Sequence, residues 1–196
     1  MKVTVRAFAK INLMLDILRT LEDGFHELFM LMQSVGLYDT VSVETDESGK
    51  ISVHCDNADI PTGSENIAYK AAEAFFEYTK VQNPGISIEI EKRIPHAAGL
   101  AGGSADAAGT VAALKKLFAP TLSDRKVAEI CAKVGSDVPF CALGGTMLAQ
   151  YTGTVLSYLP QTEIGKIVIV KPEMSVSTGK AYKAFDTAER VRHLDK

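Results

Sequence analysis

The sequence has few cysteines and lacks long hydrophobic runs. Its three cysteines, Cys55, Cys131 and Cys141, form no Cys-x-x-Cys pair, and two of them lie within apolar patterns. We therefore expect reduced core thiols in a cytoplasmic protein rather than disulfides or a metal centre. Polar residues interrupt the stretch 1–18, and no apolar run reaches the length that spans a membrane. The sequence thus predicts no membrane association.

Strong charge of one sign is absent as well. The net charge is −3 over 196 residues, and no large cluster of lysine and arginine occurs. This balance argues against nucleic acid as the main partner and favours a small-molecule partner. With 46% hydrophobic residues, a chain of this length can bury a substantial core. These properties predict a compact soluble enzyme.

The most informative stretch is 94–109, with the sequence IPHAAGLAGGSADAAG. It joins an alternating, strand-like run at 86–90 to the start of a helix. Gly99, Gly102 and Gly103 carry no Cβ, so backbone N–H groups can approach an anion closely there. A helix N-terminus adds a favourable dipole. The stretch is therefore predicted to bind phosphate.

Three other glycine motifs do not fit this stretch. No Gly-Lys pair stands in the GxxxxGK[ST] frame of a Walker loop. A GxGxxG dinucleotide fingerprint would need glycine in place of Ala101, and a GxSxG nucleophile elbow would need glycine in place of Asp106. The remaining pattern is Pro-x-x-x-Gly-Leu-x-Gly-Gly-Ser.

That pattern, from Pro95 to Ser104, resembles the ATP loop of the GHMP kinase superfamily. Further segments resemble one branch of it, whose members phosphorylate 4-diphosphocytidyl-2-C-methyl-D-erythritol in the non-mevalonate route to isoprenoid precursors. They are AFAKINL at 7–13 with DGFHEL at 23–28, and GSDVPF at 135–140. Separate segments in the right order are more specific than one loop. The resemblance implies an ATP- and Mg²⁺-dependent kinase that acts on the 2-hydroxyl of this alcohol.

The resemblance also implies roles for individual residues. It makes Lys10 and Asp137 catalytic, and it places Asn12, Phe25 and His26 at the substrate. The residues that it implies for ATP are Asn66, Pro95, His96, Ala97, Ala98, Gly99, Leu100, Ala101, Gly102, Gly103, Ser104 and Ala105.

Lys10 and Asp137 also suit phosphoryl transfer on chemical grounds. The reaction needs charge neutralised on the phosphates and a base for the attacking hydroxyl. Lys10 ends an alternating predicted strand, and Asp137 follows a predicted helix that stops at Gly135. Taken singly, Asp137 is better explained as a turn carboxylate that bonds its own backbone, and Lys10 as a charge on an edge strand. The resemblance implies that the two side chains pair.

Other candidates have structural explanations beside the functional ones. Ser104 would either satisfy a helix amide or bind a phosphate oxygen or its Mg²⁺. Helix capping explains Asn66, which the resemblance places near the adenine. His26 alone would be a surface or capping residue, whereas the resemblance sets Phe25 and His26 against the substrate's base, where Phe25 can stack on a pyrimidine. Ala101 replaces a common family glycine, and alanine tolerates the turn only with negative φ.

The order of elements predicts an α+β fold, with helices packed on a largely antiparallel or mixed sheet. The resemblance implies the ribosomal-protein-S5-domain-2-like N-terminal domain of GHMP kinases. The predicted strands cover 3–9, 11–18, 41–45, 51–55, 86–91, 146–151 and 155–159, and the predicted helices cover 66–79, 102–118 and 123–134.

Two domains are expected. Residues 1–160 would form the N-terminal ATP-binding domain, and 161–196 the truncated beginning of the C-terminal GHMP domain, with a buried strand at 167–170 and a helix at 177–190. One strand and one helix rarely bury enough surface alone, so this piece would pack on the first domain or on another copy in a homodimer. The alternative to an active kinase is a shortened, non-catalytic nucleotide-binding or interaction protein.

Overall fold

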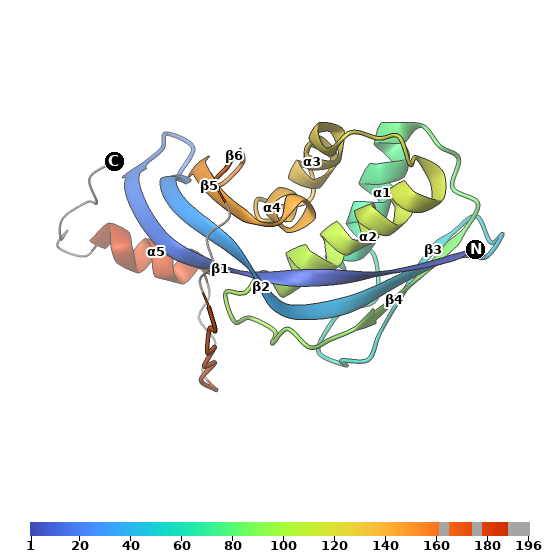
Figure 1. The fold of residues 1–196 in the computed structure, drawn as a ribbon, viewed down its shortest axis with the longest axis horizontal. Helices are drawn as coiled ribbons and strands as arrows, with labels where there is room; N and C mark the ends of the chain where they lie inside the picture. Colours follow the sequence, from blue (N-terminus) through green and yellow to red (C-terminus); the bar gives the residue numbers. More distant parts are fainter. Residues whose placement is uncertain (161–164, 174–177, 188–196) are drawn as a thin grey trace.

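A computed structural model describes residues 1–160, 165–173 and 178–187. These residues form a mixed sheet with a layer of helices on one side (Figure 1). The strands are β1 (Lys2–Thr20), β2 (His26–Thr45), β3 (Ile51–Cys55), β4 (Ile86–Glu91), β5 (Thr146–Tyr151) and β6 (Val155–Tyr158). The helices are α1 (Ile67–Thr79), α2 (Gly102–Phe118), α3 (Asp124–Ala132), α4 (Val138–Leu143) and α5 (Thr178–Thr187). The predicted α+β class is confirmed.

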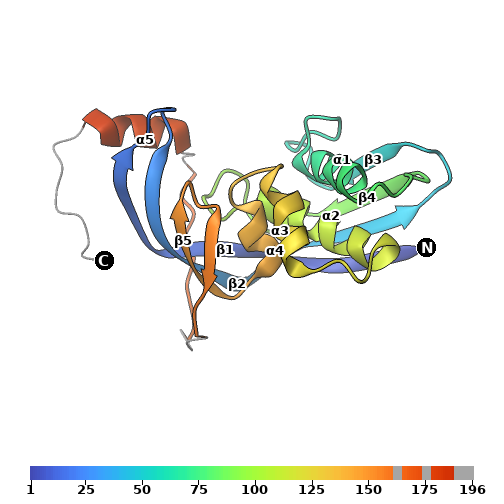
Figure 2. The ribbon, with the colours of Figure 1, turned by 90° about the horizontal axis from the view of Figure 1, so that it is seen from above.

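The sheet has the strand order β3-β4-β2-β5-β6, and β1 pairs with β2 beside this path. The β3–β4 pair is parallel, and the other pairs are antiparallel. β2 is long enough to pair with β4 through one part and with β5 through another. Seen from above, the β1–β2 hairpin therefore runs from the helical layer to β5, β6 and α5 (Figure 2).

Irregular pairing of β1 with β2 turns Lys10 toward the helices. The register shifts between Phe8 and Lys10, which is the pattern of a β-bulge. Strict alternation would put Lys10 and Ala9 on opposite faces, yet both are buried. The strands predicted at 3–9 and 11–18 are one strand, so Lys10 lies within β1 rather than at its end.

Helix α2 lies close against the sheet at Gly109. A Cβ atom there would come 3.1 Å from Val41 Cγ2 and 3.2 Å from the Cβ of Ala7. Both neighbours are fully or nearly fully buried in the main core. This close approach fixes the distance of α2 from β1 and β2, and with it the position of the helix N-terminus.

We expect Gly109→Leu to lower the free energy of unfolding by about 1–3 kcal/mol, because the added carbons overpack this contact. Lys116→Leu is the matched control, since it adds the same side chain at an exposed position of α2. Thermal denaturation of the two variants measures the difference. Equal melting temperatures would show that α2 has room to move.

The structure corrects the expectation of a buried strand at 167–170. These residues have no regular secondary structure, and Val168 and Val170 are 86% and 83% exposed. Four consecutive β-branched residues favour a strand, but a strand forms only where a partner accepts its hydrogen bonds. No strand in the described ranges pairs with this segment.

The predicted helix at 177–190 is α5 over its described part, and residues 177 and 188–190 lie outside the described residues. Its side chains Tyr182 and Phe185 pack against a second apolar cluster that includes Ile17, Leu28 and Met30. Helix α5 thus contacts the far end of the β1–β2 hairpin.

Within the described ranges, none of the helices has the length and hydropathy needed to cross a membrane.

Candidate active site

A cavity of about 1000 Å³ extends from the loop before α2 to the tip of the β1–β2 hairpin and to α5. Its size is at the upper end of the range for small-molecule pockets. The predicted site residues that line it are Lys10, Asn12, Phe25, His26, Asn66, Pro95, His96, Ala97, Ala98, Gly99, Ala101, Gly102, Gly103 and Asp137. Ser104 is not among the lining residues, and neither are the buried Leu100 and Ala105.

The loop 95–101 contains three residues in the left-handed backbone region. Ala97, Gly99 and Ala101 have φ values of 52°, 71° and 57°. Ala101 thus adopts a positive φ, contrary to the expectation that alanine tolerates this turn only with a negative φ, and left-handed backbone costs an alanine about 1–2 kcal/mol. A Cβ on Gly99 would meet nothing within 4 Å. The loop thus has a strained backbone conformation, and the space beside Gly99 on the cavity side is open.

The N-terminus of α2 has no side-chain cap. Its N-cap residue is Ala101, and the first turn contains no acidic residue. The first N–H groups of a helix have no partner within the helix, and they favour an anion. Ser104 lies in this first turn but is not the N-cap, so the structure does not show the capping role. This helix end suits a phosphate ligand.

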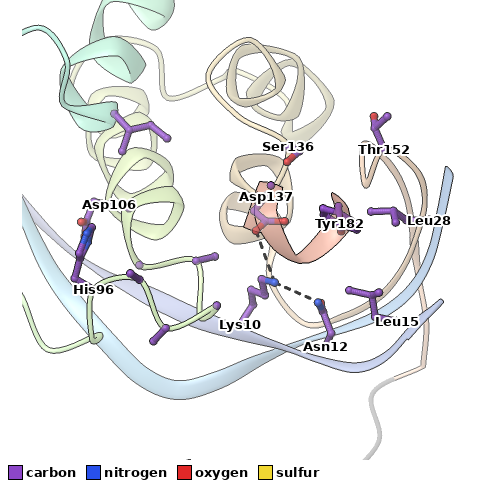
Figure 3. A pocket seen from close by; sticks show the side chains of 18 of the residues that line it. Lys10, Asn12, Leu15, Leu28, His96, Asp106, Ser136, Asp137, Thr152 and Tyr182 are labelled. Carbon is purple, nitrogen blue, oxygen red and sulfur yellow. Dashed lines mark hydrogen bonds and ion pairs between the residues drawn. The ribbon is translucent and has the colours of Figure 1, made fainter. Parts of the chain in front are cut away.

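Lys10 and Asp137 meet in the cavity although they come from distant elements (Figure 3). Lys10 Nζ lies 3.7 Å from Asp137 Oδ2 and 3.5 Å from Asn12 Oδ1. The Lys10 side chain is buried, whereas that of Asp137 is 34% exposed and open to a ligand. The predicted pairing of Lys10 with Asp137 is confirmed, and Asn12 lies on the same face of β1 as Lys10.

Asp137 is the N-cap residue of α4, yet its side chain makes no capping hydrogen bond. The interpretation as a turn carboxylate that bonds its own backbone is therefore not what the structure shows. Pro139 in the first turn helps α4 to begin there. The short helix α4 was not predicted, and the predicted helix at 123–134 ends at Ala132.

The hairpin tip and α5 form the other end of the cavity. Phe25 is 63% exposed, and its backbone N–H donates to Asp23 Oδ1 at 3.0 Å in a tight turn. The neighbouring His26 is not a surface residue: its Nε2 lies 2.8 Å from Asp186 Oδ1, and its ring stacks on Tyr182 with centroids 4.7 Å apart. Tyr182 and Asp186 also line the cavity.

Asn66 has the predicted capping role. Its Oδ1 accepts a hydrogen bond from the N–H of Ala68 at 2.7 Å, and its Nδ2 donates to the Pro61 carbonyl at 2.5 Å. Both ends of the amide are therefore engaged within the protein. A contact of this buried side chain with the nucleotide stays a prediction.

A group of three charged residues, two of which line the cavity, was missed. The Lys92 ammonium lies between the carboxylates of Asp39 and Asp106, and all three side chains are at most 6% exposed. Burial raises the pKa of Asp106 to about 7, the Asp39 charge adds to this, and Lys92 opposes it. In the sequence motifs, Asp106 stands out only as the position where a nucleophile elbow would need glycine.

Comparison with known proteins first defines the class. Residues 66–145, which include the loop and α2, match the family model described as "GHMP kinases N terminal domain". The solved homoserine kinase from Cytophaga hutchinsonii shares the fold, with a TM-score of 0.67 over 93% of this chain and 59% of that chain at 18% identity. The fold is thus that of the GHMP kinases.

Closer relatives define the branch. The chain is 47% identical over 180 residues to the 4-diphosphocytidyl-2-C-methyl-D-erythritol kinase of Acetivibrio thermocellus, covering 92% of this chain and 63% of that protein. It is 42% identical over 193 residues to the kinase of the same name from Clostridium acetobutylicum, covering 98% and 68%. The chain belongs to the 4-diphosphocytidyl-2-C-methyl-D-erythritol kinase family. The predicted resemblance is confirmed.

A solved 4-(cytidine 5'-diphospho)-2C-methyl-D-erythritol kinase matches with a TM-score of 0.67 and 38% identity, over 80% of this chain and 55% of that chain. The chain therefore spans about two thirds of the length of the curated relatives that it matches, and about half of this solved chain.

Proposed function

We propose that this chain is an ATP-dependent kinase that phosphorylates the 2-hydroxyl of 4-diphosphocytidyl-2-C-methyl-D-erythritol. One observation carries the proposal: the Lys10–Asp137 pair and the uncapped N-terminus of α2 face the same cavity. The names of relatives that are 47% and 42% identical support the choice of acceptor.

The phosphates of ATP would lie on the loop 95–105. Backbone N–H groups of its glycines and of the first turn of α2 are the donors, and the helix dipole adds attraction. The left-handed residues Ala97, Gly99 and Ala101 shape this loop before any ligand arrives. Binding then needs little reordering of the backbone.

Asp137 would act on the acceptor hydroxyl. Its carboxylate takes the hydroxyl proton while the hydroxyl oxygen forms a bond to the γ-phosphorus, and the bond from that phosphorus to the bridging oxygen of ADP breaks. The Lys10 ammonium, 3.7 Å from this carboxylate, holds it in place and offsets negative charge near the transferred group.

Mg²⁺ would enter with the nucleotide. In the described part of the chain, no group of three or more His, Cys, Asp or Glu side chains could hold a metal ion. Magnesium that accompanies a triphosphate takes one or two protein ligands and completes its shell with phosphate and water. The Ser104 hydroxyl, in the first turn of α2, is the proposed protein ligand, and the metal would neutralise phosphate charge.

Phe25 would stack on the cytosine of the acceptor. Removing the ring in Phe25→Ala should raise the KM for the cytidine-bearing alcohol about tenfold, because stacking of a base on an aromatic ring contributes about 1–3 kcal/mol. The KM for ATP should stay unchanged. Tyr158→Ala removes another exposed aromatic ring, outside the cavity, and is the matched control. An unchanged KM for the alcohol would discard the stacking role.

The proposed function is tested by a coupled assay of ADP release with a panel of alcohols. We expect turnover with 4-diphosphocytidyl-2-C-methyl-D-erythritol and Mg²⁺-ATP, and none with homoserine or mevalonate. The alternative is a non-catalytic nucleotide-binding protein. It predicts that ATP raises the melting temperature by mass action while no ADP is released with any alcohol.

We also propose the division into residues 1–160 and 161–196, with the second part as the beginning of a C-terminal GHMP domain. The exposed valines of 167–170 support a homodimer, since they offer apolar surface to a second copy. Light scattering after size-exclusion chromatography tests the dimer. A monomer at all concentrations would discard it.

A further inference from the structure

The strained loop 95–101 begins and ends beside one buried ammonium group. Lys92, which directly follows β4, contacts Asp106 through its Nζ at 2.7 Å from Oδ2. Asp106 lies one turn into α2, the helix into which the loop leads (Figure 3). The ion pair therefore joins the chain before the loop to the helix after it.

The chain before the loop is fixed by Asp39. Its Oδ2 contacts Lys92 Nζ at 2.5 Å, and its Oδ1 accepts hydrogen bonds from the backbone N–H groups of Arg93 and Ile94 at 2.5 and 2.8 Å. Asp39 is fully buried in β2, which pairs with both β1 and β4. This end of the loop is thus attached to the centre of the sheet.

The first residue of α2 packs on the same two residues. A Cβ atom on Gly102 would lie 3.1 Å from Ile94 Cγ2 and 3.3 Å from Lys92 Nζ. Glycine therefore lets the start of the helix approach the Lys92 ammonium closely. The two ends of the loop meet at this point.

This arrangement is not favourable for stability alone. Two carboxylates share one ammonium, and Asp106 Oδ1 is buried without a hydrogen-bond partner among the described residues. A buried polar atom without a partner lowers stability. Both Lys92 and Asp106 line the cavity. Sequences break such local rules mostly where function requires it.

The backbone of the loop gives the group a role. Ala97, Gly99 and Ala101 have left-handed conformations, which strain the two alanines. Strained backbone persists only where the surrounding structure holds it in place. If the helix end of the loop were released, Ala97 and Ala101 would relax to negative φ. The loop would then lose the shape that leaves its N–H groups free for phosphate.

We propose that Asp106 is a positioning residue for the nucleotide loop: through Lys92 it fixes α2 to the sheet, so that the loop keeps its left-handed residues before ATP binds. The proposal rests on ATP binding at this loop, as in the proposed function. Binding to a loop that already has the required shape loses less conformational entropy and restores no strain. The group of three charges thus raises the affinity for ATP without touching it.

Isothermal titration calorimetry with Mg²⁺-ATP tests the proposal on Asp106→Ala, which leaves Lys92 paired with Asp39 alone. We expect the dissociation constant to rise about tenfold, because binding must then restore left-handed backbone at an alanine. Asp106→Asn keeps the shape and weakens the ion pair to a neutral hydrogen bond, so the constant should rise about threefold. Charge alone predicts the opposite sign, since removing a carboxylate favours a polyanion nearby. An unchanged or lower constant in both variants overturns the inference.

Rescue by glycine separates positioning from a general loss of structure. Adding Ala101→Gly to Asp106→Ala should return the dissociation constant to within about threefold of the wild type, because glycine adopts positive φ without strain. In the wild type the same substitution should change it less than about twofold, since the loop is already held. Ala98→Gly is the matched control, because Ala98 lies in the same loop outside the left-handed region. No rescue by Ala101→Gly, or equal rescue by Ala98→Gly, contradicts the proposal.

Thr110→Ala is the control for the stability of α2. Thr110 is buried one turn beyond Asp106, and its hydroxyl donates to the Asp106 carbonyl at 2.9 Å. The substitution removes a buried polar side chain but leaves the ion pair intact, so the dissociation constant should equal that of the wild type. An equal rise in Thr110→Ala would overturn this inference and leave the kinase proposal standing. A wild type that binds no ATP overturns both.

Discussion

Asp137→Asn is expected to lower kcat by about 10²–10⁴-fold, the usual contribution of a positioned general base. The amide keeps the shape of the side chain but accepts no proton from the acceptor hydroxyl. It also loses the ion pair with Lys10 Nζ, 3.7 Å away. ATP binding should stay largely intact, because the loop and the N-terminus of α2 supply the phosphate contacts. Initial rates of ADP release measure the effect.

Asp124→Asn is the control for this substitution. It removes the same charge from a side chain that is 76% exposed. Asp124 Oδ1 lies 3.1 Å from Lys115 Nζ, and neither residue lines the cavity. Its kcat should lie within twofold of the wild type. If Asp137→Asn lost the ATP-induced rise in melting temperature together with its activity, Asp137 would be a structural residue and not the base.

Local sequence signals were sufficient for the elements around the loop. The alternation at 86–91 and the glycine-rich start at 102 gave the bounds of β4 and α2 as the structure has them. Strand β5 likewise has its predicted bounds, 146–151. In each case the hydrophobic period identifies the type of element, and a clear signal within a few residues marks where it begins or ends.

Longer-range features were not accessible in this way. β2 begins at His26 although the prediction gave only 41–45, because its first half contacts β5 and its second half β4. The changing neighbours break the simple alternation on which a strand prediction depends. The bulge that turns Lys10 inward depends in the same way on its partner strand.

The site divides along the same line. Motif residues such as Lys10 and Asp137 were recognisable because each lies in a short distinctive segment. The buried group of Asp39, Lys92 and Asp106 was not, because Asp39 and Lys92 are 53 positions apart and each looks like an ordinary charged residue beside a strand. Tyr182 and Asp186 of α5 were also missed as cavity residues. A signal for them existed, since Tyr182, Phe185 and Asp186 follow helical spacing on one face of the predicted helix.

Lys92→Met is expected to lower the free energy of unfolding by about 3–5 kcal/mol, the usual cost of removing one partner from a buried ion pair. Methionine fills much of the space of the lysine side chain, so lost packing contributes little. The carboxylates of Asp39 and Asp106, which are almost fully buried, would then face each other without a cation. Urea unfolding at pH 8 measures the loss.

Lys2→Met is the matched control in the same sheet. Lys2 pairs with Glu89 at 2.7 Å, but the two side chains are 44% and 55% exposed, so water replaces the pair and the urea midpoint should hardly change. Adding Asp39→Asn and Asp106→Asn to Lys92→Met should restore part of the loss. A loss of equal size in the triple variant would assign the effect to packing instead of charge.

The pH dependence of Lys92→Met separates charge from packing further. The folded-state pKa of Asp106 is raised to about 7 from an ordinary value of 3.8, so Asp106 contributes stability at acid pH that is lost as the pH rises through 7. Lys92 opposes this rise in pKa, and its removal therefore enlarges the loss. The difference in the free energy of unfolding between variant and wild type should widen from pH 5 to pH 8. A constant difference across that range would contradict a charge origin, because lost packing does not titrate.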